Sequence, residues 1–121
     1  MLKSLYWQVN FFFKNLKSKR MKRRFGGKTS TLTVETKNGI FIVDAADLEV
    51  GGKLRTKGEY GTEEINRISN YISDKSSVLI VGAHIGSLAI PIAKKCSKLV
   101  AIEANPRNFD LLQKNIELNK I

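Results

Sequence analysis

The sequence of 121 residues predicts an α/β protein, in which a parallel strand-helix-strand-helix unit follows a β-hairpin and a basic N-terminal helix. A glycine-bounded turn connects an apolar strand to a helix within residues 77–95. A second strand and a second helix follow within residues 98–118, and an Asn-Gly pair upstream separates two short apolar stretches. Such alternation of strands and helices is typical of a parallel sheet with right-handed crossovers.

The N-terminal segment, residues 1–28, combines an apolar helical face with a run of positive charge. Its large apolar residues recur every three or four positions, so they share one face of an amphipathic helix. They are Leu2, Leu5, Tyr6, Val9, Phe12, Phe13 and Leu16. Six of the eight residues from Lys17 to Arg24 are basic, and two glycines then end the helix. The segment holds nine of the 21 basic residues, and so most of the net charge of +10.

This composition favours three interpretations of the N-terminal helix, in descending order. The apolar face covers the core of the domain, or residues 1–24 make a peripheral contact with an anionic membrane. Nucleic acid comes last, and we do not expect it as a partner, because nucleic-acid-binding proteins usually interleave basic residues with the surface they present.

Cysteine usage bounds the compartment and the metal chemistry. Cys96 is the only cysteine, so an internal disulfide is excluded, and the sequence has no Cys/His cluster for a metal ion. We therefore expect a cytoplasmic protein without a metal site, either soluble or peripheral on the inner face of the membrane.

Residues 29–121 form the predicted domain, which opens with a hairpin and a helix. Alternating Leu32/Val34 and Ile40/Ile42 flank Lys37-Asn38-Gly39, the strongest short-range hairpin signal. Residues 45–61 hold four glycines and predict a loop. Thr62 is a suitable N-cap, and two glutamates in the first turn favour a helix there. The expected buried stripe of this helix is Ile65, Ile68, Tyr71 and Ile72.

The second half of the domain carries the parallel unit. Residues 77–81 predict a strand, 82–86 a tight turn, 87–95 a helix, 98–103 a strand and 106–118 a helix. Asn105 caps the last helix, and Pro106 occupies its first position, where a missing N–H costs nothing. The expected buried residues of that helix are Phe109, Leu112 and Ile116.

The turn and the second strand end predict a nucleoside site. Glycine at positions 82 and 86 lets a ligand approach the backbone at the carboxyl ends of the strands. Glu103 ends the second strand, where its carboxylate can accept hydrogen bonds from both ribose hydroxyls, each worth roughly 1.5–3 kcal/mol. The dinucleotide fingerprint requires further glycines where the chain has His84 and Ser87. A pyrophosphate-containing ligand is therefore disfavoured.

Three segments resemble the FkbM family of methyltransferases. They are Val-Gly-Ala-His-Ile-Gly at 81–86, Pro-Ile-Ala-Lys-Lys at 91–95, and 101–119, which begins Ala-Ile-Glu-Ala-Asn-Pro. The resemblance implies a Rossmann-like class I methyltransferase fold that uses S-adenosyl-L-methionine to methylate an oxygen of a sugar or secondary metabolite. Two positions depart from the family pattern, since Ile80 replaces an Asp and His84 an Asn.

The resemblance also implies a set of cofactor-binding residues. They are Gly82, Ala83, His84, Gly86, Glu103 and Ala104. It indicates no catalytic residue and no particular small-molecule or glycan acceptor. Because the parallel unit ends at Ile121, we expect a truncated, incomplete fold that is inactive alone, with a partner chain completing the sheet. The alternative hypothesis is a truncated or degenerate, non-catalytic binding module that associates through its basic N-terminal helix.

Overall fold

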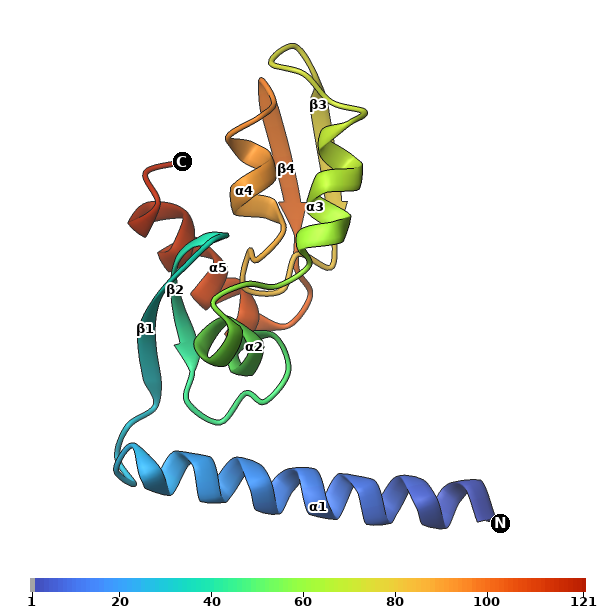
Figure 1. Ribbon diagram of the computed structural model, residues 1–121, viewed down its shortest axis with the longest axis vertical. Coiled ribbons are helices and arrows are strands. Elements are labelled where there is room, and N and C mark those ends of the chain that lie inside the picture. The colour runs from blue at the N-terminus through green and yellow to red at the C-terminus, as the bar shows by residue number, and fades with distance from the viewer. Residues whose placement is uncertain (1) are drawn as a thin grey trace.

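The structure, a computed structural model, describes residues 2–121 and contains helices and strands in mixed order (Figure 1). In chain order they are α1 (Leu2–Arg24), β1 (Thr31–Thr36), β2 (Gly39–Asp44), α2 (Val50–Lys57), α3 (Thr62–Ser69), β3 (Ser77–Val81), α4 (Ala89–Ala93), β4 (Lys98–Ile102) and α5 (Pro106–Leu118). The hairpin lies beside α2 and α5 in the middle of the molecule, with β3 and β4 at one end and α1 at the other (Figure 1).

The predicted hairpin is present, with Thr36 opposite Gly39 at its turn. Gly39 has a φ of +134°, a backbone conformation that residues with a Cβ atom strongly disfavour. On the second strand the alternation was assigned to Ile40 and Ile42, but the buried residues are the other two. Phe41 and Val43 are fully buried, while Ile40 and Ile42 are half-buried. All four residues from Ile40 to Val43 are apolar, so the sequence alone fits both phases equally well.

The loop predicted for residues 45–61 is wrong, because α2 lies within it. Asp47 precedes this helix, which begins at Val50, and its carboxylate accepts hydrogen bonds from the backbone N–H of Glu49 at 2.8 Å and of Gly51 at 2.7 Å. Gly51 is buried, and a methyl group there would lie 3.0 Å from Cβ of Val43. The glycine in α2 therefore permits close packing on β2 instead of breaking the helix.

The next helix, α3, also differs from its prediction at both ends. Gly61 is its N-cap and Thr62 its first residue, and the helix ends at Ser69. Ile65 is buried as expected, but Tyr71 lies beyond the helix and is 85% exposed.

The core joins the hairpin to the parallel unit. Its buried cluster consists of Phe41, Val43, Leu54, Ile85, Ile90 and Leu111. These residues come from β2, α2, α4, α5 and the turn after β3, so the hairpin packs on the same core as the glycine turn. On α5, Leu112 is buried as predicted, whereas Phe109 is 42% exposed and Asn115 is fully buried.

The predicted strand-helix-strand-helix unit is present. β3 and β4 pair in parallel from Ser77↔Lys98 to Val81↔Ile102. The intervening helix α4 spans fewer residues than predicted, since it begins at Ala89 and ends at Ala93. One sheet face is apolar and exposed, and it carries Leu79, Val81, Val100 and Ile102.

The apolar face of α1 does not cover the core, contrary to the first interpretation. Tyr6, Val9, Phe12, Phe13 and Leu16 keep 46–69% of their surface exposed. The other side of α1 rests on the domain, where Ser18 Oγ donates to the Ala46 carbonyl oxygen at 2.5 Å and Lys14 pairs with Glu49 at 3.0 Å. Among the described residues, no helix is long and apolar enough to cross a membrane.

Candidate cofactor site

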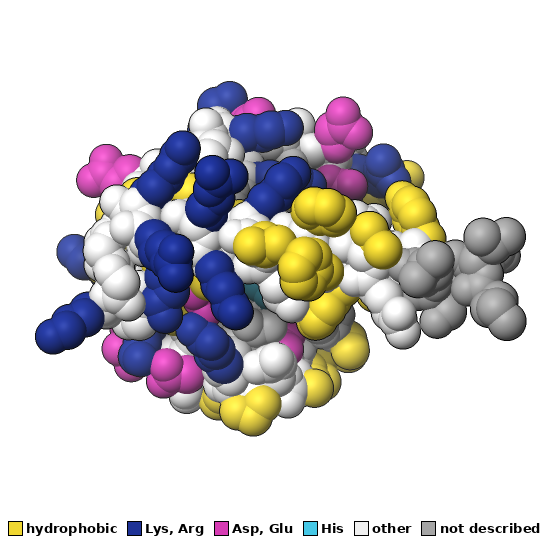
Figure 2. Space-filling view, turned by 90° about the horizontal axis from the view of Figure 1, so that it is seen from below, with side chains coloured by type: hydrophobic (Ala, Val, Ile, Leu, Met, Phe, Trp, Pro, Cys, Tyr) yellow, Lys and Arg dark blue, Asp and Glu magenta, His cyan; other side chains and the backbone are white. Residues whose placement is uncertain are grey.

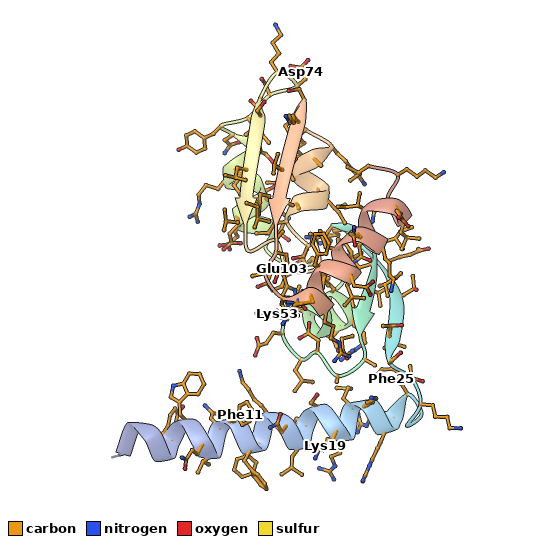
Figure 3. All side chains as sticks on the ribbon, turned by 180° about the vertical axis from the view of Figure 1, so that it is seen from behind. Phe11, Lys19, Phe25, Lys53, Asp74 and Glu103 are labelled. Atoms are coloured by element: carbon orange, nitrogen blue, oxygen red, sulfur yellow. The ribbon has the colours of Figure 1, made fainter. Side chains whose placement is uncertain are left out.

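The candidate site lies where β3 and β4 end, at the carboxyl edge of the parallel pair. Gly82 follows β3 and Glu103 follows β4, so the pairing of the two strands brings these residues to one edge. Backbone N–H groups of Gly82 and Ala83 donate to the Ile102 carbonyl oxygen at 2.8 and 3.0 Å. The glycine turn is thus attached to the end of β4, and Glu103 lies at this edge in Figure 3.

The carboxylate of Glu103 joins the two loops that follow the strands. Its Oε2 accepts a hydrogen bond from the His84 N–H at 2.7 Å, and its Oε1 accepts one from the Asn105 N–H at 2.9 Å. These two bonds, with that of Asn105 the larger influence, lower the pKa of the Glu103 carboxyl below its ordinary value. The carboxylate is therefore ionised at neutral pH, and each oxygen keeps a further lone pair for a ligand hydroxyl.

His84 occupies a conformation that few side chains adopt. Its φ is +52°, in the left-handed region where Asn, Asp and His are enriched among non-glycine residues. Its Nδ1 atom is buried and has no hydrogen-bond partner within the part of the chain that the structure describes. A buried ring nitrogen without a partner is costly. A ligand atom or an ordered water molecule placed beside the ring would satisfy this nitrogen.

The two glycines of the turn have different surroundings. At Gly82, with φ +79°, no atom lies within 4 Å of where a Cβ would stand. At Gly86, with φ +92°, a Cβ would lie only 2.8 Å from Leu112 Cδ1 and 3.1 Å from Ile90 Cδ1. Gly82 therefore leaves space open beside the strand end, whereas Gly86 permits packing of the turn against α4 and α5.

A cavity of about 240 Å³ adjoins the turn. It is lined by Val50, Tyr60, Ile80, Gly82, Ala83, His84, Ser87 and Leu88. No lysine or arginine is among these lining residues, which suits a ligand without phosphate groups. Ile80 contributes an apolar wall at the position where the FkbM pattern has an acid. Ala104 is exposed and does not line the cavity.

Two lining residues, Val50 and Tyr60, come from the segment predicted as a loop. Tyr60 is held by Asn38 of the hairpin turn, whose Oδ1 accepts from the Tyr60 N–H at 3.1 Å and whose Nδ2 donates to the Tyr60 carbonyl oxygen at 2.6 Å. The same Nδ2 donates to the Ser87 carbonyl oxygen at 2.8 Å. The Asn-Gly pair signalled the turn, but no sequence signal indicated this second role of the buried asparagine.

The glycine cradle, the ionised Glu103 and the unpartnered His84 Nδ1 together fit a nucleoside ligand. Gly82, Ala83 and His84 line one cavity, and the Glu103 carboxylate, which does not line it, accepts a hydrogen bond from the His84 N–H. Gly86 supports the turn from behind. Three of the six expected residues thus line the cavity, whereas Gly86, Glu103 and Ala104 are not among its lining residues.

Comparison with known proteins identifies a different methyltransferase family from the one the motifs resemble. The TRM5/TYW2 methyltransferase domain matches residues 33–121. The chain is 34% identical over 96 residues to the tRNA (guanine(37)-N(1))-methyltransferase Trm5b of Methanocaldococcus jannaschii, which covers 78% of this chain and 26% of that protein. The FkbM assignment is therefore wrong.

Solved structures confirm the class I methyltransferase-like α/β fold. M. jannaschii TYW2 in complex with AdoMet matches with a TM-score of 0.61 and 28% identity, over 78% of this chain and 41% of that chain. The complex of aTrm5 and tRNALeu matches with a TM-score of 0.58 and 28% identity, over 77% of this chain and 26% of that chain. This chain spans less than half the length of each of these relatives.

The expectation about partners is also wrong. A small-molecule or glycan acceptor was expected and nucleic acid was not, yet the relative Trm5b is named as a tRNA methyltransferase and one similar structure contains tRNALeu. The reason is physical. The glycine turn and the strand-terminal acid contact the cofactor in class I folds of many kinds, so they indicate the cofactor and not the methyl acceptor.

Proposed function

We propose, because this chain belongs to the TRM5/TYW2 methyltransferase domain family, that it carries the S-adenosylmethionine-binding part of an enzyme that methylates N1 of guanine in tRNA. The observation that carries the proposal is the match of residues 33–121, which includes every residue of the candidate site. The curated relative Trm5b is named for methylation at guanine 37, and the related TYW2 structure contains AdoMet.

Within this proposal the chain's residues bind and orient the cofactor. The Glu103 carboxylate accepts hydrogen bonds from the ribose hydroxyls, using the lone pairs that the backbone N–H groups leave free. Gly82 lets the ligand approach the end of β3, and Tyr60 and Ile80 supply apolar walls of the cavity. His84 Nδ1 gains a partner on the ligand side.

The bound cofactor supplies a methyl group on a positively charged sulfur. In the overall reaction guanine N1 loses its proton to a base and forms a bond to the methyl carbon, while the carbon–sulfur bond breaks and leaves a neutral thioether. Ile80 and Tyr60 would supply apolar walls, without Lys or Arg, for a cofactor that carries a positive charge and no phosphate.

The test is methyl transfer from labelled S-adenosylmethionine to tRNA transcripts by the complete enzyme that contains this part, because we expect residues 1–121 to be inactive alone. We expect label on a transcript with guanine at position 37 and none on the same transcript with adenine there. Because N1-methylguanine cannot form a Watson–Crick pair, reverse transcription should also stop at that position. Cofactor binding in calorimetry without transfer to tRNA contradicts the proposed substrate, and absence of cofactor binding contradicts the proposed site.

A further inference from the structure

The outward side of α1 carries a dense group of cations outside the matched methyltransferase domain. The basic face, as we call it, consists of Lys17, Lys19, Arg20, Arg23 and Arg24, and all five are exposed. Lys14 and Ser18, which contact the domain, are four residues apart and share one side of the helix. At 3.6 residues per turn, Lys19, Arg20 and Arg23 lie on the other side, with Lys17 and Arg24 at its border. Figure 2, seen from the α1 side, shows Lys and Arg gathered over one half of this surface.

We propose that the basic face binds the phosphate backbone of RNA, independently of base sequence. The basic face would be a second contact for the tRNA substrate, and this part of the proposal rests on the proposed function. It assigns a role to α1, which precedes the segment that matches the family, residues 33–121.

The cations of the basic face are not neutralised by the protein. Lys14 on the domain side pairs with Glu49, whereas none of the five takes part in an ion pair with a residue that the structure describes. Like charges three and four positions apart, such as Arg20 with Arg23 and Arg24, destabilise a helix. The helix dipole favours cations in the last turn, but Lys17 and Arg20 lie before it. An external anion accounts for the whole group.

The length of the basic face indicates a polyanion. Seven steps separate Lys17 from Arg24, which at 1.5 Å per residue spans about 10 Å of helix. That span exceeds a single phosphate group and is comparable with successive phosphates along a nucleic acid backbone. The exposed rings of Phe12 and Phe13 lie next to it along the helix and offer stacking surfaces for unpaired bases.

The basic face lies on the same side of the molecule as the candidate cofactor site. The carboxyl ends of β3 and β4 point toward α1, with α2 between them (Figures 1 and 3). In Figure 3 Lys53 is seen between Glu103 and α1, while Asp74 marks the far end of the domain. The helix that carries the basic face and the edge where methyl transfer is proposed therefore lie toward the same end of the molecule.

A membrane is the competing partner, and the arrangement along α1 argues against it. In an interfacial membrane helix the charged and the apolar residues occupy opposite faces. Here Val9, Phe12, Phe13 and Leu16 and the basic face share the outward side and follow one another along the axis.

The test compares two triple variants that remove equal charge. The first is Lys17→Gln, Arg20→Gln and Arg24→Gln on the basic face. The matched control is Lys75→Gln, Lys94→Gln and Lys98→Gln, at exposed positions near the amino ends of β3 and β4. Binding of a fluorescent tRNA transcript to the full chain is measured by anisotropy from 50 to 300 mM salt, with circular dichroism to verify that both variants remain folded.

The first variant should bind tRNA on the order of a hundredfold more weakly at about 0.15 M salt, and the slope of log K against log salt should fall by about 2 to 3. The control should change affinity only a few-fold. An unrelated RNA duplex should lose affinity in parallel with the tRNA. Equal losses in both variants overturn the proposal, as does an unchanged salt slope in the first.

Two further measurements separate this proposal from its alternatives. Loss of sedimentation with phosphatidylserine vesicles but unchanged tRNA affinity in the basic-face variant assigns α1 to membranes and overturns the proposal. Calorimetric binding of S-adenosylmethionine should be unchanged in that variant. If the unmutated chain binds RNA in a salt-dependent way through α1 but fails to bind the cofactor, the result contradicts the proposed function. The same result supports the role of the basic face.

Discussion

Asn115 of α5 and its C-cap Asn119 complete the hydrogen bonding of β2, and Asn115 provides a sharp test of the fold. Asn115 Oδ1 accepts from the Ile42 N–H at 2.7 Å, and its Nδ2 donates to the carbonyl oxygens of Ile42 at 3.2 Å and Ile85 at 2.9 Å. Asn119 makes the corresponding pair with Ile40, at 3.1 and 2.6 Å. The four-residue step from Asn115 to Asn119 rises about 6.0 Å along a helix, and the two-residue step between Ile42 and Ile40 spans about 6.7 Å along a strand. Because the two spacings are similar, both amides reach the strand edge.

Replacing Asn115 with Ala should destabilise the fold by about 2–4 kcal/mol. The substitution leaves three backbone groups of Ile42 and Ile85 without partners at a site with no exposed surface. A buried unsatisfied group costs about 1–3 kcal/mol, and water that enters the vacated space recovers part of this. Replacement with Leu, which fills the space and excludes that water, should cost more, about 3–5 kcal/mol.

The order of the two variants is the diagnostic result. At an ordinary packing site Leu is better tolerated than Ala, because it fills the cavity. Urea denaturation followed by circular dichroism gives the free energies, and the exposed Gln113→Ala on the same helix is the control, with a change within about 0.5 kcal/mol. A loss below about 1 kcal/mol for Asn115→Ala, or a smaller loss for Leu than for Ala, refutes the reasoning.

Three predictions concern the cofactor site. Gly86→Ala should destabilise the fold by about 1–3 kcal/mol, because its methyl group would overlap Leu112, whereas Gly82→Ala should cost about 1 kcal/mol from its positive φ and mainly weaken S-adenosylmethionine binding in calorimetry. Glu103→Gln should weaken cofactor binding at least tenfold with near-native circular dichroism, and unchanged binding contradicts the site assignment. The pKa of Glu103 is lowered in the folded protein, so the ionised carboxylate stabilises the fold above the ordinary glutamate pKa, near 4.3, and this stabilisation is lost as pH falls through the folded pKa. The melting temperature should therefore decrease when the pH is taken below about 4. In Glu103→Gln this decrease should be less steep.

The parts of the fold that the sequence predicted are those with a local code. Glycine at position 82 follows five strand residues, and Asn105-Pro106 marks the start of α5, where Asn105 Oδ1 accepts from the Arg107 N–H at 3.0 Å. The strand-terminal place of Glu103 followed from the same periodicity. Each of these signals lies within a few residues of the structure that it specifies, so no knowledge of the tertiary fold was needed.

The parts that the sequence did not predict depend on distant contacts. In the sequence Gly51 indicates a break in a helix, and only its contact with the Val43 side chain shows that it permits close packing. Asn115 is polar but lies on the buried side of α5, so a rule based on hydropathy places it wrongly. Its partner Ile42 is 73 residues away in the chain. The family was misassigned for a related reason, since the short motifs around the turn describe the cofactor side of the fold, whereas the match over residues 33–121 also includes most of the hairpin and the helices α2 and α3.

The hairpin positions residues of the candidate cofactor site, although none of its own residues lines the cavity. Asn38 at its turn binds the backbone of Tyr60 and Ser87, and Asn115 connects Ile42 of β2 to Ile85 within the glycine turn. Buried amides that satisfy several backbone groups at once restrict the backbone more strongly than apolar packing does, because a small displacement leaves several polar groups unpaired. The hairpin therefore fixes two lining segments, at Tyr60 and at Ser87, relative to one another. A site for a rigid nucleoside requires its lining residues to be held at fixed positions. The hairpin that precedes the parallel unit therefore acts as a positioning element for the candidate site.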